Sequence, residues 1–179
     1  MLIEKLNDIN FDEVYELMEM SFPKDERRTY SEQKNLLNNP MYRIYVFRAC
    51  ETQQIQAFIA VWELGEIAFV EHLAVNPMCR NNGIGAKVLN ELVNNVGKMV
   101  CLEVEPPNDE MSSRRIEFYK RNNFFFNEYF YIQPPMSEGR KSIQLYIMTS
   151  ERKITESEFN NIKNMLYKEV YCVDTEKSM

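Results

Sequence analysis

A glycine-containing segment, Arg80-Asn81-Asn82-Gly83-Ile84-Gly85, has the composition of an anion-binding loop. It follows an apolar run that ends at Val75 and precedes a stretch with helical periodicity. The start of a helix exposes N–H groups without intrahelical partners at the positive end of the helix dipole. Glycine lets the backbone approach an anion because it has no Cβ, and a guanidinium such as that of Arg80 suits phosphate. The segment therefore predicts a site for a phosphorylated ligand.

Two common phosphate-binding fingerprints do not fit this loop. The dinucleotide motif G-x-G-x-x-G would need a third glycine soon after Gly85, and the residues that follow, Ala86-Lys87-Val88, do not supply it. The P-loop would need lysine directly after its last glycine, and Ala86 stands there instead. What remains is R-x-x-G-x-G, between an apolar strand and an amphipathic helix.

This arrangement resembles motif A of the GNAT superfamily, the acyl-CoA-dependent N-acetyltransferases. The resemblance implies an enzyme that uses acetyl-CoA as the acyl donor and needs no metal. In the family, the loop holds the CoA pyrophosphate, and the strand before it pairs with the pantetheine arm as an added strand would. The residues to which this assigns CoA binding are Leu73, Ala74, Val75, Arg80, Asn81, Asn82, Gly83, Ile84 and Gly85.

Tyr119 is the candidate general acid. It lies near the end of a later helical stretch, in Tyr119-Lys120-Arg121-Asn122-Asn123-Phe124, which resembles the family's Y-x-x-x-G-F with Asn123 in place of glycine. Asparagine tolerates the left-handed conformation better than most residues. The resemblance implies that Tyr119 protonates the departing thiolate, and a phenol with a pKa of about 10 suits that step. The alternative is a core tyrosine whose hydroxyl has a structural partner.

Ser112 occupies a second position with a family counterpart. Many family members carry an asparagine seven residues before the tyrosine, where it contacts the CoA arm. Ser112 stands there in this chain, so the resemblance implies a CoA contact. A serine at the start of a helix can equally cap it.

The acceptor amine must lose a proton, so a general base is expected. Glu71 is the first candidate, because family members often carry a glutamate on this strand and strand alternation puts Glu71 on the face of Leu73. His72 would then point the other way, but its ordinary pKa of roughly 6.5 suits the task. Glu103 and Glu105, on the next strand, are further candidates, and water is the remaining alternative to a side-chain base.

The charged segment 21–28 is expected to roof the acceptor pocket, as it commonly does in the superfamily. Phe22, Glu26 and Arg27 are its candidate specificity residues. Taken singly, each charge also suits a solvated loop. The acceptor stays open between a small-molecule amine and a peptide amine.

Composition narrows the class of protein. The 179 residues suit one domain, and the net charge of −6 disfavours nucleic-acid binding. The sequence shows no apolar run long enough for a membrane span and no signal peptide, and its four cysteines are widely spaced. We therefore expect a cytoplasmic protein with reduced thiols that binds neither nucleic acid nor membrane.

Hydrophobic periodicity predicts the order βααβββαβαββ and a further C-terminal helix. The predicted fold class is α+β in α/β/α layers, with a central mixed, mostly antiparallel sheet flanked by helices, as in GNAT proteins. A helix is expected to begin at an Asn10 cap, and another to follow a Thr155/Glu158 capping box. We expect residues 1–150 to form the acetyltransferase domain and residues 151–179 to form a helix packed on it or extending it. That helix could cover a sheet edge, form a homodimer contact or line the acceptor site.

Two rival functions also use the phosphate loop. One is a non-catalytic CoA-binding sensor with the same fold, against which an intact Tyr119 argues. The other is a regulatory domain that binds phosphate or a nucleotide, which would need no parting of the strands.

Overall fold

The computed structural model describes residues 2–6 and 10–173. Its strands form one seven-stranded sheet in the order β1-β2-β3-β4-β5-β7-β6. The strands are β1 (Leu2–Lys5), β2 (Tyr42–Arg48), β3 (Ile55–Leu64), β4 (Ile67–Val75), β5 (Met99–Val104), β6 (Phe124–Gln133) and β7 (Ile143–Ser150). All neighbouring strands run antiparallel except β4 and β5, which are parallel. The sheet is therefore mixed and mostly antiparallel, as predicted.

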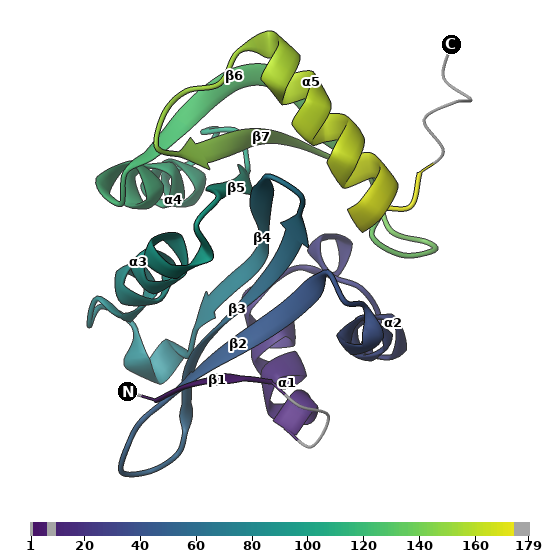
Figure 1. Ribbon diagram of the computed structural model, residues 1–179. Coiled ribbons are helices and arrows are strands. Elements are labelled where there is room, and N and C mark those ends of the chain that lie inside the picture. The colour runs from purple at the N-terminus through teal and green to yellow at the C-terminus, as the bar shows by residue number, and fades with distance from the viewer. Residues whose placement is uncertain (1, 7–9, 174–179) are drawn as a thin grey trace.

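Helices cover both faces of the sheet (Figure 1). The α-helices are α1 (Phe11–Ser21), α2 (Tyr30–Asn35), α3 (Ile84–Val96), α4 (Glu110–Arg121) and α5 (Glu156–Met165). Short 3₁₀ turns are η2 (Lys24–Glu26), η3 (Leu36–Asn38) and η4 (Pro77–Cys79), and α5 continues as a π-helical turn, η5 (Leu166–Val170). Within the described ranges, no helix is both long and apolar enough to cross a membrane.

The core has one half on each side of the sheet. Side chains from α1 and α5, such as Met18 and Phe159, pack on one face with Trp62 of β3. Side chains from α3 and α4, such as Leu89 and Ile116, pack on the other face. The central strands β3 and β4 are buried on both faces, which explains their nearly unbroken apolar sequences.

The helix starts differ from the sequence-based expectations at two places. Asn10 precedes α1, but its side chain makes no capping hydrogen bond; its φ of −104° and ψ of 10° are outside the extended region that an N-cap uses. Ser112, which the sequence also allows as a cap at the start of a helix, lies inside α4, because the helix begins at Glu110 and Asp109 is its N-cap. The Thr155/Glu158 capping box before α5 is present as predicted.

Strand β4 carries a bulge at Glu71. Ala60 of β3 pairs with His72, while its neighbour Val61 pairs with Val70, so Glu71 has no partner in the ladder with β3. A bulge interrupts side-chain alternation. Glu71 contacts Trp62 and His72 packs against Phe22, so both side chains lie on the α1 face of the sheet.

The predicted alternation around Glu71 was therefore wrong. Leu73 and Val75 pack on the α3 face, so Glu71 does not share their face, and His72 lies on the same side as Glu71. The sequence shows an unbroken strand here, and the extra residue becomes visible only in the pairing with β3.

Candidate functional site

A pocket of about 730 Å³ lies where β4 and β5 part. The two strands pair only from Ile67 with Met99 to Val70 with Leu102. Beyond that point both strands line the pocket, through residues 71–75 of β4 and Glu103 of β5. The backbone edge of β4 that faces β5 thus has no strand partner there in the described part of the chain, and it can bind an extended ligand.

The predicted phosphate loop forms one end of this pocket. Arg80, Asn81 and the segment from Gly83 to Ala86 line it, so the first turn of α3 faces the cavity. Gly83 takes the left-handed conformation, with φ of 70°, that turns the chain into α3. A Cβ at Gly85 would lie 3.4 Å from a Val75 methyl carbon and 3.5 Å from the Phe118 ring, which are ordinary van der Waals distances, so the start of α3 packs directly on these neighbours.

Arg80 lies beside the free edge of β4. Its Nε–H donates a hydrogen bond to the Val75 carbonyl at 3.3 Å, and the residue is exposed. The fixed Nε leaves the other guanidinium N–H groups available to an anion in the pocket. The loop before Arg80 is ordered by Asn76, whose side chain accepts from the Met78 N–H at 3.1 Å.

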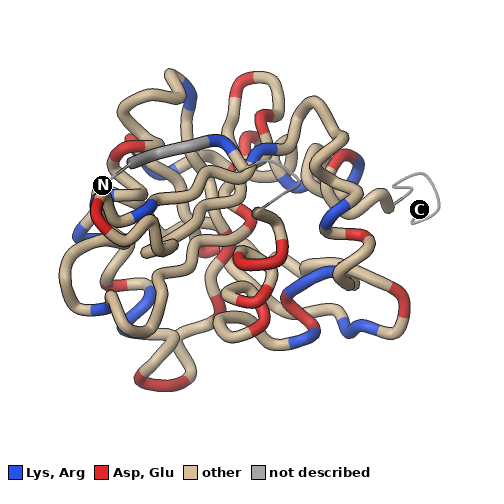
Figure 2. The backbone as a smooth tube through the Cα atoms, turned by 90° about the horizontal axis from the view of Figure 1, so that it is seen from below, with Lys and Arg blue, Asp and Glu red and all other residues tan. Residues whose placement is uncertain are grey.

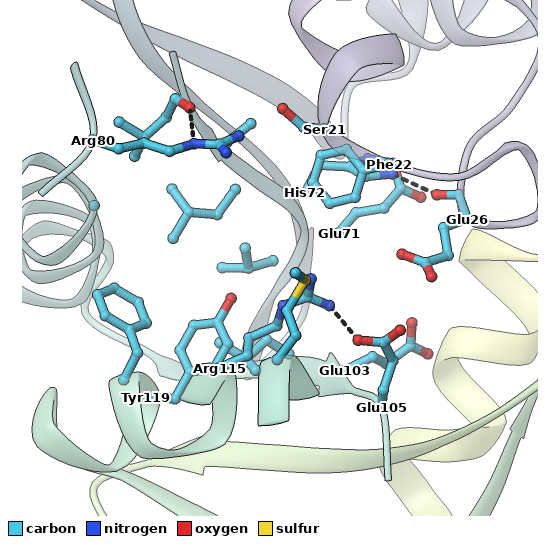
Figure 3. Close-up of a pocket in the computed structure, with 18 of the residues that line it drawn as sticks. Ser21, Phe22, Glu26, Glu71, His72, Arg80, Glu103, Glu105, Arg115 and Tyr119 are labelled. Atoms are coloured by element: carbon cyan, nitrogen blue, oxygen red, sulfur yellow. Dashed lines mark hydrogen bonds and ion pairs between the residues drawn. The ribbon is translucent and has the colours of Figure 1, made fainter. Parts of the chain in front are cut away.

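Tyr119 comes from α4 and lies in the wall between the two ends of the pocket. Its hydroxyl points into the cavity (Figure 3), although the residue is only 9% exposed. Burial raises the pKa of Tyr119 to about 12, with Arg115 acting in the opposite direction. The phenol is therefore protonated at neutral pH. Asn123 after the helix has φ of 62°, the left-handed conformation expected where the family's Y-x-x-x-G-F pattern has glycine.

Carboxylates gather at the opposite end of the pocket. Figure 3 shows Glu26, Glu71, Glu103 and Glu105 on one side of the cavity and Arg80 and Tyr119 on the other. In the view from below, several Asp and Glu segments lie close together near the middle, while others lie at the periphery among Lys and Arg (Figure 2). Glu105 pairs with Arg115 at 2.5 Å. Burial and the nearby Glu105 raise the pKa of Glu26.

Glu71 is held in a buried ion pair. Its Oε1 accepts from Arg28 at 2.5 Å and from the Trp62 indole N–H at 3.2 Å, and its side chain is 2% exposed. Burial opposes the charge, but Arg28 and His72 lower the pKa of Glu71 to about 2. A carboxylate so strongly held as an anion is a weak proton acceptor near neutral pH.

Glu103 has the opposite character. Burial raises its pKa to about 7, although the hydroxyls of Tyr131 and Tyr171 lower it in part. The Tyr171 hydroxyl lies 3.0 and 2.8 Å from the two carboxylate oxygens. A carboxylate in a pocket with a pKa near the working pH suits proton transfer. His72, another candidate base, is also buried, and its Nε2 lies 2.8 Å from the Glu26 carbonyl.

Three predicted residues lie outside the pocket lining. Ser112 is 3% exposed, and its hydroxyl donates to the Asp109 carbonyl at 3.1 Å in the capping box of α4. Asn82 donates from its side chain to the Cys79 carbonyl. Arg27 pairs with Glu19 at 3.0 Å. Met111 and Arg115 are the residues from the first half of α4 that face the cavity instead.

Sequence reasoning missed Arg28 and Tyr171. Each is far along the chain from the residue that it contacts, Glu71 or Glu103. A tyrosine directly after an amphipathic C-terminal helix carries no signal of such a contact. The apolar part of the lining, Met20, Phe22, Met136 and Leu145, also has no motif.

Comparisons with known proteins find similarity in sequence and in overall fold. The model of the acetyltransferase (GNAT) family matches residues 11–124. A solved structure from Bacteroides thetaiotaomicron, described as an acetyltransferase from the GNAT family, is 29% identical, with a TM-score of 0.88 over 97% of this chain and 100% of its own. A comparison with curated proteins found no match.

Two further solved structures show the same fold. The ribosomal-protein-S18-alanine N-acetyltransferase from Escherichia coli is 16% identical, with a TM-score of 0.64 over 86% of this chain and 95% of its own. An aminoglycoside 6'-N-acetyltransferase solved with coenzyme A is 17% identical, with a TM-score of 0.60 over 84% of this chain and 96% of its own.

The raised pKa of Glu103 predicts a cost to stability. The folded protein binds the Glu103 proton more tightly than the unfolded chain does. The contribution of this proton to the free energy of unfolding is therefore fully present below the unfolded pKa and is lost as pH rises through 7. Glu103→Gln removes the buried charge. We expect its free energy of unfolding at pH 8 to exceed that of the wild type by about 2 kcal/mol, with a smaller difference at pH 5.

Urea denaturation at both pH values measures this effect. Glu105→Gln is the control, because its ion pair is more exposed and should contribute less than about 1 kcal/mol at either pH. A loss of stability in Glu103→Gln that is the same at pH 5 and pH 8 would contradict the prediction.

Proposed function

This chain belongs to the GNAT family of acetyltransferases, and we propose that it transfers the acetyl group of acetyl-CoA to an amine by direct attack. One observation supports this most strongly. A single pocket has an anion-binding helix start at one end, carboxylates at the other and the Tyr119 hydroxyl between them. A sensor that only binds CoA would need neither a protonated phenol nor a carboxylate of raised pKa beside the acyl group.

The donor end fits acetyl-CoA. The N–H groups at the start of α3 and the Arg80 guanidinium suit the pyrophosphate. The free edge of β4, from Leu73 to Val75, suits the amide groups of the pantetheine arm. A backbone N–H near Leu73 would polarise the thioester carbonyl. Ser112 lies outside this arrangement, so we do not assign it to CoA binding.

Two side chains of the pocket can handle the protons of the reaction. As the amine nitrogen bonds to the acyl carbon and the C–S bond breaks, Glu103 accepts the proton of the amine. Tyr119 gives its proton to the departing sulfur and is reprotonated from solvent. We prefer Glu103 to Glu71 as the base, because the pKa of Glu103 is raised and that of Glu71 is lowered. Glu71 then serves to hold Arg28.

The acceptor end favours a cationic amine. Arg28 neutralises Glu71 and Arg115 neutralises Glu105, which leaves the carboxylates of Glu26 and Glu103. With Glu103 occupied by the reacting amine, Glu26 can attract a second positive charge. Structural neighbours include enzymes whose names give amine-bearing acceptors, spermidine and aminoglycosides. We propose a small acceptor with two amino groups over a peptide amine.

Tyr119→Phe should lower kcat about 100-fold, because the thiolate leaves without a proton donor. The affinity for acetyl-CoA, measured by calorimetry, should stay within about twofold. Tyr146→Phe, a change to a half-buried tyrosine on β7, is the control. Turnover of Tyr119→Phe at the wild-type rate would remove Tyr119 from the mechanism.

Arg80→Ala should weaken CoA binding about tenfold through loss of a charge-assisted phosphate contact. CoA and dephospho-CoA, which keeps the pyrophosphate but lacks the 3'-phosphate, are titrated by calorimetry. An equal loss of affinity for both ligands assigns the contact to the pyrophosphate. Lys98→Ala, at the far end of α3, removes the same charge away from the site. An unaltered Kd for Arg80→Ala is incompatible with the role given to this residue.

A panel of monoamines, diamines and peptides, assayed by thiol release from acetyl-CoA, tests the acceptor. Diamines should give the highest kcat/KM. Glu26→Gln should raise the KM for diamines about fivefold and leave monoamines nearly unchanged, because only the second charge is affected. Glu16→Gln is the control on the exposed side of α1. Binding of CoA without thiol release for any amine would indicate a sensor instead.

A further inference from the structure

We infer that the C-terminal helix is part of the acceptor site: Tyr171 positions the Glu103 carboxylate, and Arg28 holds Tyr171 in place. The inference rests on the proposed function and assigns the roles of two further residues. Both act through Glu103, so they are positioning residues. The helix lies beyond residue 124, where the match to the family model ends.

Tyr171 is built into the site. The residue is 9% exposed and lines the pocket, and its hydroxyl lies 2.8 Å from Oε2 and 3.0 Å from Oε1 of Glu103. A hydroxyl between two carboxylate oxygens donates its one proton to either of them. A hydrogen bond to the charged form stabilises that form and fixes its orientation.

The π-helical turn determines where Tyr171 points. Helix α5 is α-helical to Met165 and then widens in η5, so that the Tyr171 N–H donates to the Leu166 carbonyl at 3.0 Å. One extra residue in a turn rotates all later side chains by about 100° relative to an α-helix. Such turns are rare and occur often at functional sites. Here the turn directs Tyr171 toward Glu103.

Arg28 links this turn to the sheet through a hydrogen bond to the turn and an ion pair with strand β4. Its Nη2 donates to the Val170 carbonyl at 2.8 Å, and its Nη1 donates to Glu71 at 2.5 Å. The carbonyls in the last turn of a helix lack intrahelical partners, and the guanidinium satisfies this one. Arg28 is 6% exposed, so removal of either partner would leave a buried charge or carbonyl unsatisfied. The residue next to Val170 is Tyr171.

Glu103 is surrounded by ionisable groups from five parts of the chain. The groups that interact with it are Arg28, Glu71, Cys101, Tyr131, Tyr167 and Tyr171. Glu71 raises the pKa of Glu103, whereas Arg28, Tyr131 and Tyr171 lower it. Burial is the largest influence and raises the pKa of Glu103, and the Tyr171 hydroxyl, which contacts both carboxylate oxygens, acts against it.

Tyr171→Phe tests the contact by removing one oxygen. We expect kcat/KM for the amine at pH 7 to fall about tenfold, and the midpoint of its pH profile to rise by about one pH unit. The sign follows because the base works deprotonated and the lost hydrogen bond stabilised that form. The Kd for acetyl-CoA should not change.

Tyr167→Phe is the matched control. It removes a hydroxyl from the same turn, but that hydroxyl donates to the Ile132 carbonyl of β6. Burial and Glu103 raise the pKa of Tyr167, but the neutral Tyr167 hydroxyl is not among the groups that shift the pKa of Glu103. The pH midpoint of Tyr167→Phe should therefore equal that of the wild type, which separates the contact with Glu103 from a general loss of packing.

A second measurement needs no turnover. The infrared band of the protonated carboxyl group that disappears in Glu103→Gln reports the protonation of Glu103 directly. In Tyr171→Phe, the pH midpoint of this band should rise by the same amount as the kinetic midpoint. If the wild type acetylates no amine, the proposed function fails, and this titration still decides whether Tyr171 acts on Glu103.

Arg28→Lys tests the link that the Arg28 guanidinium makes between Glu71 and the Val170 carbonyl. Lysine keeps the positive charge beside Glu71 but lacks the planar fork that reaches two acceptors at once. We expect a shift in the same direction as for Tyr171→Phe, and no further shift in the double variant. Additive shifts would overturn the role of Arg28, and unchanged profiles and bands in Tyr171→Phe would overturn that of Tyr171. Circular dichroism during heating confirms that each variant is folded.

Discussion

At Glu71, strand β4 has one residue more than β3 can pair with, and two consecutive side chains turn to the same face of the sheet. The pairing of β4 with β5 ends one residue earlier, at Val70. The site depends on this separation. It leaves a free backbone edge for an extended ligand, opens the pocket to the α1 face and lets Glu103 approach it from the neighbouring strand.

The bulge buries the Glu71 carboxylate, and Arg28 neutralises its charge. A lone carboxylate at Glu71, with a side chain 2% exposed, would cost several kcal/mol. Arg28 neutralises it, and the same guanidinium binds the Val170 carbonyl. One arginine thus joins the segment after η2, strand β4 and the end of the C-terminal helix. The acceptor end of the pocket is assembled from segments that are far apart in the chain.

The two ends of the pocket meet different physical demands. The proposed donor end is local, because a strand, a turn and the first turn of α3 lie within about a dozen residues and present backbone groups to the pocket. The acceptor end holds carboxylates that repel one another, and burial raises the pKa values of Glu26 and Glu103. A raised pKa of this kind weakens the fold near neutral pH and suits the base proposed above, a compromise that is common at active sites.

The sequence by itself determined the family, the order of strands and helices, the glycine-containing loop before α3 and the inward position of Tyr119. These features depend on local patterns, such as helical periodicity, glycine in register with Arg80 and an asparagine at 123 that accepts a positive φ. Only the tertiary structure decided the environments of the carboxylates. Glu71 and Glu103 look alike in the sequence. Arg28 holds Glu71 as an anion, whereas burial, with Tyr171 at the carboxylate, puts the pKa of Glu103 at about 7. The physical reason is that a pKa depends on which charges and hydroxyls approach through space, and here these come from residues 28 and 171, which no local pattern connects to either strand.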